Sequence, residues 1–166
     1  MISSKNPLFT STALLLTVMM SGAQSPSSPA KQPMTTHHAK GTFEVTLKPA
    51  ALADAGADGK LARMSIDKKF AGDLVGTSKG EMLSAKTDTK GSAGYVAIEK
   101  VVGELDGRKG TFVFQHSATM DHGQPHLSVV VVPDSGTEGL AGIKGTFQID
   151  IKDGKHLYDF EYSLPQ

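Results

Sequence analysis

The stretch YVAIEKVVGELDGRKGTFVFQHSAT, residues 95–119, consists of two alternating runs separated by the pair Asp106-Gly107. Both residues of that pair tolerate the positive φ that a tight hairpin needs. The second run places three large side chains on one face: Phe112, Phe114 and His116. A period of two is typical of a half-buried strand. The stretch therefore predicts two antiparallel strands, Tyr95–Leu105 and Gly110–Thr119, joined by a short turn.

Similar alternation recurs on both sides of this hairpin. It predicts six further strands, at 41–48, 61–70, 74–85, 127–132, 143–151 and 156–164. The last two strands form a hairpin around Asp153-Gly154, and the loop between the first two leaves room for a short helix near 50–55. Closure of eight antiparallel strands removes the edges that invite aggregation. We therefore predict an all-β fold, a closed eight-stranded antiparallel β-barrel.

The size and composition of the chain exclude several classes of protein. The 166 residues carry a formal net charge of zero, are 39% hydrophobic and include no cysteine. A nucleic-acid-binding surface needs a surplus of Lys and Arg, so we expect no nucleic-acid partner. Neither a disulfide nor a Cys-ligated zinc site can form. One globular domain fits the length.

The N-terminus has the organisation of an export signal. Residues 1–23 contain one positive charge, an apolar stretch from Leu8 to Met20, and a small-residue end at Ala23. The stretch is shorter than a bilayer span, although an uncleaved anchor is the alternative. We expect cleavage near Ala23, periplasmic or secreted localisation and no membrane contact afterwards. Residues 24–40, rich in Pro, Ser and Thr, are expected to be a flexible linker before a single domain at 41–166.

A family resemblance covers most of the predicted domain. It rests on four segments: AKGTFEV (39–45), GSAGYVAIEKVVGELDGRKGTFVFQHSATM (91–120), VVPDSGTEGLAGIKG (131–145) and GKHLYDFEYSL (154–164). These resemble the bacterial domain-of-unknown-function family numbered 3224. The resemblance implies a closed barrel similar to that of allene oxide cyclase and the dirigent proteins, without an agreed activity. Asp134 departs from the family pattern, which more usually has glycine there.

The alternation of side chains between the two faces of each strand, called here strand parity, identifies two candidate catalytic residues, Glu99 and His116. Counting outward from Asp106-Gly107 brings them within about two residues of direct opposition on neighbouring strands. Inside a barrel, each would stabilise the charged form of the other and the pair could move a proton on a bound ligand. The alternatives are a core histidine bonded to a backbone carbonyl and an ordinary surface salt bridge.

Candidate ligand-binding residues come from the same parity argument. Tyr158 and Tyr162 share an aromatic face with His156 and Phe160, and a tyrosine hydroxyl can serve an apolar cavity. The other candidates are Tyr95, Phe114 and Arg63. The alternative for the tyrosines is a core position with a satisfied hydroxyl. Arg63 would need an anionic partner if it faced inward, and would be solvated if it faced outward.

Other patterns do not support a metal, cofactor or hydrolase site. Gly123 and Pro125 prevent His122 and His126 from sharing a helix face, and the adjacent pair His37 and His38 lies in the expected linker. The glycine-rich residues 136–145 lack the ending of a phosphate-binding loop. Ser128 and Ser135 have no nucleophile-elbow context. We expect no metal and no cofactor.

Three functions remain open from the sequence. The first is a binding module that holds a small, partly apolar molecule inside the barrel. The second is a cofactor-free isomerase or cyclase that uses His116 and Glu99, so whether the protein is an enzyme stays open. The third is a structural, oligomeric protein without a ligand. Val129–Val132 is apolar on both faces, and another subunit, in a homo-oligomer, is the simplest cover for its outer side.

Overall fold

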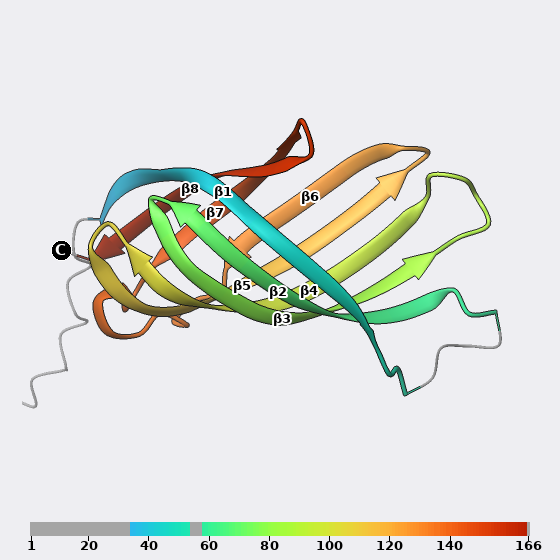
Figure 1. The fold of residues 1–166 in the computed structure, drawn as a ribbon, viewed down its shortest axis with the longest axis horizontal. Helices are drawn as coiled ribbons and strands as arrows, with labels where there is room; N and C mark the ends of the chain where they lie inside the picture. Colours follow the sequence, from blue (N-terminus) through green and yellow to red (C-terminus); the bar gives the residue numbers. More distant parts are fainter. Residues whose placement is uncertain (1–33, 54–57, 166) are drawn as a thin grey trace, which may run out of the picture. The chain divides into compact units, whose positions relative to one another are not determined.

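A computed structural model describes residues 34–53 and 58–165 (Figure 1). Eight strands follow one another in chain order, each antiparallel to the next, and the last pairs with the first to close a barrel. The strands are β1 Met34–Ala50, β2 Leu61–Gly72, β3 Leu74–Lys86, β4 Ala93–Leu105, β5 Arg108–Asp121, β6 Gln124–Val131, β7 Lys144–Lys152 and β8 Lys155–Pro165. One 3₁₀ turn, η1 Glu138–Leu140, lies between β6 and β7. The predicted fold class is confirmed.

Three of the hairpins are closed by two-residue turns with positive φ at both positions. The φ angles are 51° and 74° at Asp106-Gly107, and 53° and 74° at Asp153-Gly154. His122-Gly123 repeats the pattern with 49° and 88°. This is the type I′ geometry whose twist matches that of the flanking strands. Both Asp-Gly hairpins predicted from the sequence are confirmed.

The expected linker at 24–40 is wrong over its last part, because β1 begins at Met34. Residues from Met34 onward pair with β8, and Ala39 is buried against the core. The ring of His37 stacks on Tyr162 with 5.4 Å between centroids. The partner strand imposes this extension, since the residues themselves show no apolar alternation. The rest of the linker and the export signal lie outside the described residues.

The loop after β1 contains no helix over 51–53, and 54–57 fall outside the described residues. Nor does any described part of the chain contain a helix long and apolar enough to span a bilayer.

Aromatic side chains fill one half of the barrel, called here the filled half. Their ring centroids lie 4.8–6.3 Å apart. The rings belong to Phe43, Phe70, Phe112, Phe114, Phe147, Tyr158 and Phe160. Leu74, Leu105, Leu140 and Ile143, all fully buried, close the end where the β2–β3 and β4–β5 turns and η1 lie. This end of the barrel is therefore packed like an ordinary protein core.

The other half is called here the open half. Large apolar side chains at inward positions there remain exposed: Leu47 (45%), Met120 (42%), Leu127 (44%) and Ile151 (64%). The interior is thus filled in one half and open in the other.

The outer wall of the barrel also exposes apolar side chains, but chiefly on β3 and β4. They are Val75, Leu83, Val96, Ile98 and Val102. On β6, by contrast, Val129 and Val131 are buried and the outward Val130 is half-buried. The largest unpartnered apolar surface therefore does not lie on the valine run that the sequence indicated.

Candidate functional site

Four polar side chains from four neighbouring strands meet inside the barrel: Lys68 of β2, Ser78 of β3, Glu99 of β4 and His116 of β5, together called the Glu99 cluster. Alternation turns each of them inward. Register then brings them together, because Lys68 pairs with Ser78 and Ala97 pairs with His116. Their exposed fractions are 8%, 2%, 0% and 3%. The cluster is therefore removed from water.

Glu99 is the hub of these contacts. Lys68 Nζ donates a hydrogen bond to Glu99 Oε2 at 2.7 Å, and the Ser78 hydroxyl donates to Oε1. Burial by itself would raise the pKa of Glu99, but its contacts with His116, Lys68 and Ser78 outweigh burial and lower the pKa to about 2. The carboxylate is therefore ionised at neutral pH.

Lys68 has a second interaction that suits a buried ammonium group. Its Nζ lies 4.8 Å from the ring centroid of Phe43. A cation over an aromatic face is attracted by the ring quadrupole. Lys68 is thus held between the carboxylate and the aromatic packing of the filled half.

His116 is less completely satisfied. Its Nε2 lies 3.0 Å from Glu99 Oε2 without forming a hydrogen bond to it. Nε2 is therefore a buried nitrogen that lacks a hydrogen-bond partner among the described residues. The predicted proximity of Glu99 and His116 is confirmed, including their offset of two residues, since Glu99 pairs with Phe114.

A cavity of about 400 Å³ occupies the open half and is called here the open cavity. Inward side chains of five strands line it: Met82 and Ser84 of β3, Tyr95 of β4, Ala118 and Met120 of β5, Leu127 of β6 and Ile151 of β7. Ala118 pairs with Tyr95 and is the next inward residue after His116. The open cavity therefore begins one layer from the Glu99 cluster, and neither Glu99 nor His116 lines it.

Tyr95 links the cluster to the open cavity. Burial and the negative charge of Glu99 both raise the pKa of the Tyr95 phenol. The phenol is protonated at neutral pH even without these two effects, and they make its ionisation still less favourable. Its hydroxyl forms no hydrogen bond with the described residues.

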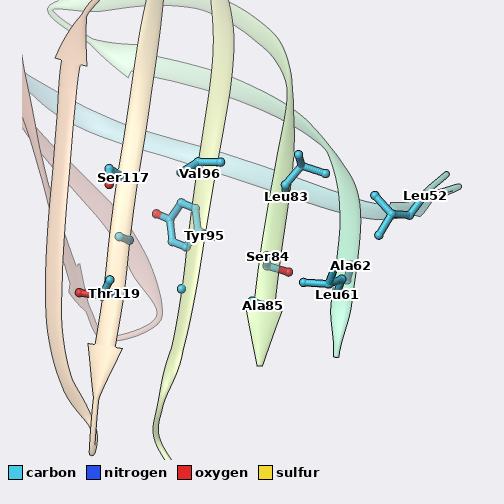
Figure 2. Close-up of a pocket in the computed structure, with 12 residues that line it drawn as sticks. Leu52, Leu61, Ala62, Leu83, Ser84, Ala85, Tyr95, Val96, Ser117 and Thr119 are labelled. Atoms are coloured by element: carbon cyan, nitrogen blue, oxygen red, sulfur yellow. The ribbon is translucent and has the colours of Figure 1, made fainter. Parts of the chain in front are cut away.

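A second hollow, of about 450 Å³, lies at the same strand ends (Figure 2). Leu61, Leu83 and Val96, which alternate outward, line it together with Leu52 from the segment after β1. It shares Tyr95 and Ser84 with the open cavity. The ends of β2–β5 thus have accessible apolar surface on both faces.

The structure separates the remaining predicted ligand residues. Tyr95 lines the open cavity, whereas Phe114 and Tyr158 belong to the filled half. The Tyr158 hydroxyl accepts a hydrogen bond from the backbone amide of Leu74 at 2.9 Å, as a satisfied core tyrosine would. Tyr162 lies near the opposite end, beside His37. Those three side chains do not line the open cavity.

Arg63 points out of the barrel. It forms an ion pair with Glu81 of β3 and donates to the backbone carbonyl of Ala51 at 3.1 Å. The buried residues Ile66 and Lys68 show that the even-numbered residues of β2 face inward. The odd-numbered residues, which include Arg63, therefore face outward. An inward role for Arg63 is therefore wrong.

Sequence reasoning missed Lys68 and Ser78, and most of the lining of the open cavity. Lys68 lies between the apolar residues Ile66 and Phe70 on one strand face, so strict parity would have identified it. Ser78 and Met82 give a weaker signal, because small or flexible residues occur on either face.

The described residues contain no group of three or more His, Cys, Asp or Glu side chains that could hold a metal ion. His122 contacts the carboxylate of its neighbour Asp121, and His38 contacts Asp159.

Comparisons with known proteins agree with the architecture. A family model described as "Protein of unknown function (DUF3224)" matches residues 39–162. The chain is similar to a crystal structure of a protein of unknown function from that family, from Shewanella oneidensis MR-1. The identity is 46%, the TM-score is 0.72, and the match covers 81% of this chain and 99% of the other. No curated protein matches the chain.

Proposed function

The chain belongs to the DUF3224 family of proteins of unknown function, and we propose that it binds one small, partly apolar molecule in the open half of its barrel. The observation that carries the proposal is the open cavity of about 400 Å³. Small-molecule sites commonly have volumes of roughly 300–1,000 Å³, with mostly apolar walls and a few polar groups.

The exposed apolar side chains at this end supply the driving force. Leu47, Met120, Leu127 and Ile151 all occupy inward positions but remain in contact with water. Each Å² of apolar surface removed from water contributes about 25 cal/mol. A ligand in the open cavity would cover part of this surface without any rearrangement of the barrel.

The Glu99 cluster supports binding more than catalysis. A cofactor-free isomerase or cyclase would need Glu99 and His116 to line the cavity that holds its substrate, and the open cavity is lined by neither. Tyr95, a neutral phenol at pH 7 as tyrosines ordinarily are, gives the cavity a hydroxyl that can orient a ligand.

Native mass spectrometry of the protein purified gently from its own host tests this proposal. We expect a retained small molecule in the natural protein and its loss in Ala118→Phe, which projects a ring into the open cavity. The matched control is Gln115→Phe, on the exposed outer face of the same strand, which should keep the ligand. Retention in Ala118→Phe, or an empty natural protein, would contradict the proposal.

Export is a second part of the proposed role. Residues 1–23 would direct the chain out of the cytoplasm, and cleavage near Ala23 would leave the barrel in the periplasm or the medium. The intact mass of the protein from each cell fraction measures this. A chain that keeps residues 1–23 in the cytoplasmic fraction would refute it.

A structural, oligomeric role is favoured by one observation, the apolar outer face of β3 and β4. Its valine, leucine and isoleucine side chains are interleaved with both signs of charge, Lys79 and Lys100 beside Glu81 and Glu104. A two-fold related second copy could therefore match apolar with apolar and cation with carboxylate. Sedimentation velocity should show an oligomer that Val96→Lys dissociates, and a monomeric natural protein would exclude this role.

A further inference from the structure

Three hydrogen-bond donors lie together on one wall of the open cavity. Ser84 of β3 pairs directly with Tyr95 of β4, and Lys86 follows Ser84 on the same face of β3. Side chains directly opposite each other have Cβ atoms about 5 Å apart, and same-face neighbours along a strand are about 7 Å apart. Lys86, Ser84 and Tyr95 thus occupy one wall of the cavity and are called here the polar strip; in Figure 2 the Ser84 hydroxyl points toward β2 and the Tyr95 hydroxyl toward β5.

The rest of the cavity differs in character. The facing strands contribute Met120, Leu127 and Ile151, which are apolar. No aspartate or glutamate is among the described residues that line the cavity, whereas Lys86 and His126 are. Lys86 also has no ion-pair partner within 34–53 and 58–165.

The nearest buried negative charge, that of Glu99, lies closer to Tyr95 than to Lys86, which pairs with Ala93 at the end of β4. Glu99 lies two inward positions below Tyr95 on β4, where it is paired with the ammonium group of Lys68 at 2.7 Å. Its charge, after burial, helps to raise the pKa of the Tyr95 phenol, and the same field disfavours an anion directly beside that hydroxyl. All three groups of the strip are then donors, and Lys86 adds a formal positive charge.

We propose that the molecule bound in the open half is an amphiphilic carboxylate. Its apolar body would lie against Met120, Leu127 and Ile151, and its carboxylate would accept hydrogen bonds from Lys86 and Ser84, at the end of the strip farther from Glu99. This rests on the proposed function and adds the chemical class of the ligand. Charge-assisted hydrogen bonds to a carboxylate are about twice as strong as neutral ones, so the strip favours this head group over an alcohol or an amine.

A methyl NMR titration tests the proposal at the site itself. The host is grown on [methyl-¹³C]methionine, and Met82 and Met120, which line the cavity, are assigned through their leucine variants. The probes share one eight-carbon chain and differ only in head group: octanoate, 1-octanol and octylamine. We expect all three to shift the Met82 and Met120 signals, with octanoate the tightest.

Charge-removing variants separate the head group from the tail. Lys86→Gln should weaken octanoate about tenfold and leave 1-octanol unchanged. Lys100→Gln, which removes one lysine from the exposed outer face of β4, should alter neither. Equal affinity for octanoate and 1-octanol, tighter binding of octylamine, or octanoate affinity insensitive to Lys86→Gln would each overturn the carboxylate assignment while leaving a binding site. If none of the probes moves either methionine signal, the proposed function fails as well.

Discussion

Replacing Glu99 by glutamine removes the negative charge at the centre of the Glu99 cluster. The ammonium group of Lys68 would then remain buried, at 8% exposure, without a counter-charge. Breaking a buried ion pair from one side costs about 3–5 kcal/mol of folding stability. We therefore expect Glu99→Gln to lower the free energy of unfolding by about that amount at pH 7.

Removing the charges together should cost less. In Lys68→Met/Glu99→Gln, no unpaired charge is left by the broken ion pair, and apolar replacement of a buried pair is often close to neutral. The double variant should therefore be more stable than Glu99→Gln alone. The difference measures the coupling between the two side chains.

The same carboxylate predicts a pH dependence with a definite sign. The pKa of Glu99 is about 2 in the folded protein against a usual value of 4.5. Because the folded value is lower, its contribution is complete above about pH 5 and is lost as the pH falls toward 2. The full loss is about 3 kcal/mol, since each pKa unit corresponds to about 1.4 kcal/mol, and about two-thirds of it is gone by pH 3.

Urea unfolding followed by circular dichroism at pH 7 and pH 3 measures both effects. The gap between the natural protein and Glu99→Gln should narrow by about 2 kcal/mol at pH 3, because only the natural protein carries this titration. Glu44→Gln, on the exposed outer face of β1, is the control and should change stability by less than about 0.5 kcal/mol. A cost below about 1 kcal/mol for Glu99→Gln, with a gap that does not depend on pH, would refute the reasoning.

Four other substitutions test the barrel that carries the site, each by thermal and urea unfolding. Gly107→Ala should lower the free energy of unfolding by about 1–2 kcal/mol. The φ angle is 74° there and the space around the residue is open, so backbone strain is the only cost. An unchanged melting temperature would argue against the type I′ turn. Tyr158→Phe leaves the buried amide of Leu74 without its acceptor and should cost about 1–3 kcal/mol, while ligand retention survives; loss of the ligand instead would place Tyr158 at the site. Gly80→Ala should be severely destabilising, because the added Cβ would lie 2.3 Å from a carbonyl oxygen of β4. In Gly94→Ala the added Cβ meets nothing closer than 3.5 Å, so this variant should be tolerated. Similar stabilities for the two variants would contradict the close approach of β3 and β4.

Local signals were sufficient to predict most of the barrel. Alternation located the strands, and Asp106-Gly107 and Asp153-Gly154 located hairpins whose φ values only a few residue types accept readily. The start of β1 was missed because residues 34–40 become a strand only through pairing with β8, which is distant in the sequence. Pairing of this kind has no local signature.

The candidate site was predictable only in part, for a similar reason. Parity and the position of one turn were enough to bring Glu99 and His116 together. Lys68 was overlooked because a lysine is seldom buried unless it is paired, and its partner Glu99 lies on another strand. The open cavity depends on how far the aromatic rings extend along the barrel, and that follows from ring packing in three dimensions.

The position of the Glu99 cluster accounts for the division of the barrel into two halves. Aromatic side chains fill the space on one side of it, and on the other side the next inward residues include Ala97 and Ala118, which are too short to reach across. A buried ion pair gives no more stability than apolar side chains of the same volume would, so stability alone does not explain why the aromatic packing stops there. The Glu99 cluster connects β2, β3, β4 and β5 through one carboxylate. It therefore keeps these strands in fixed positions around the cavity, beneath short side chains. Collapse of the open half would disturb these ionic contacts, so a ligand of the kind proposed above would find the cavity already formed.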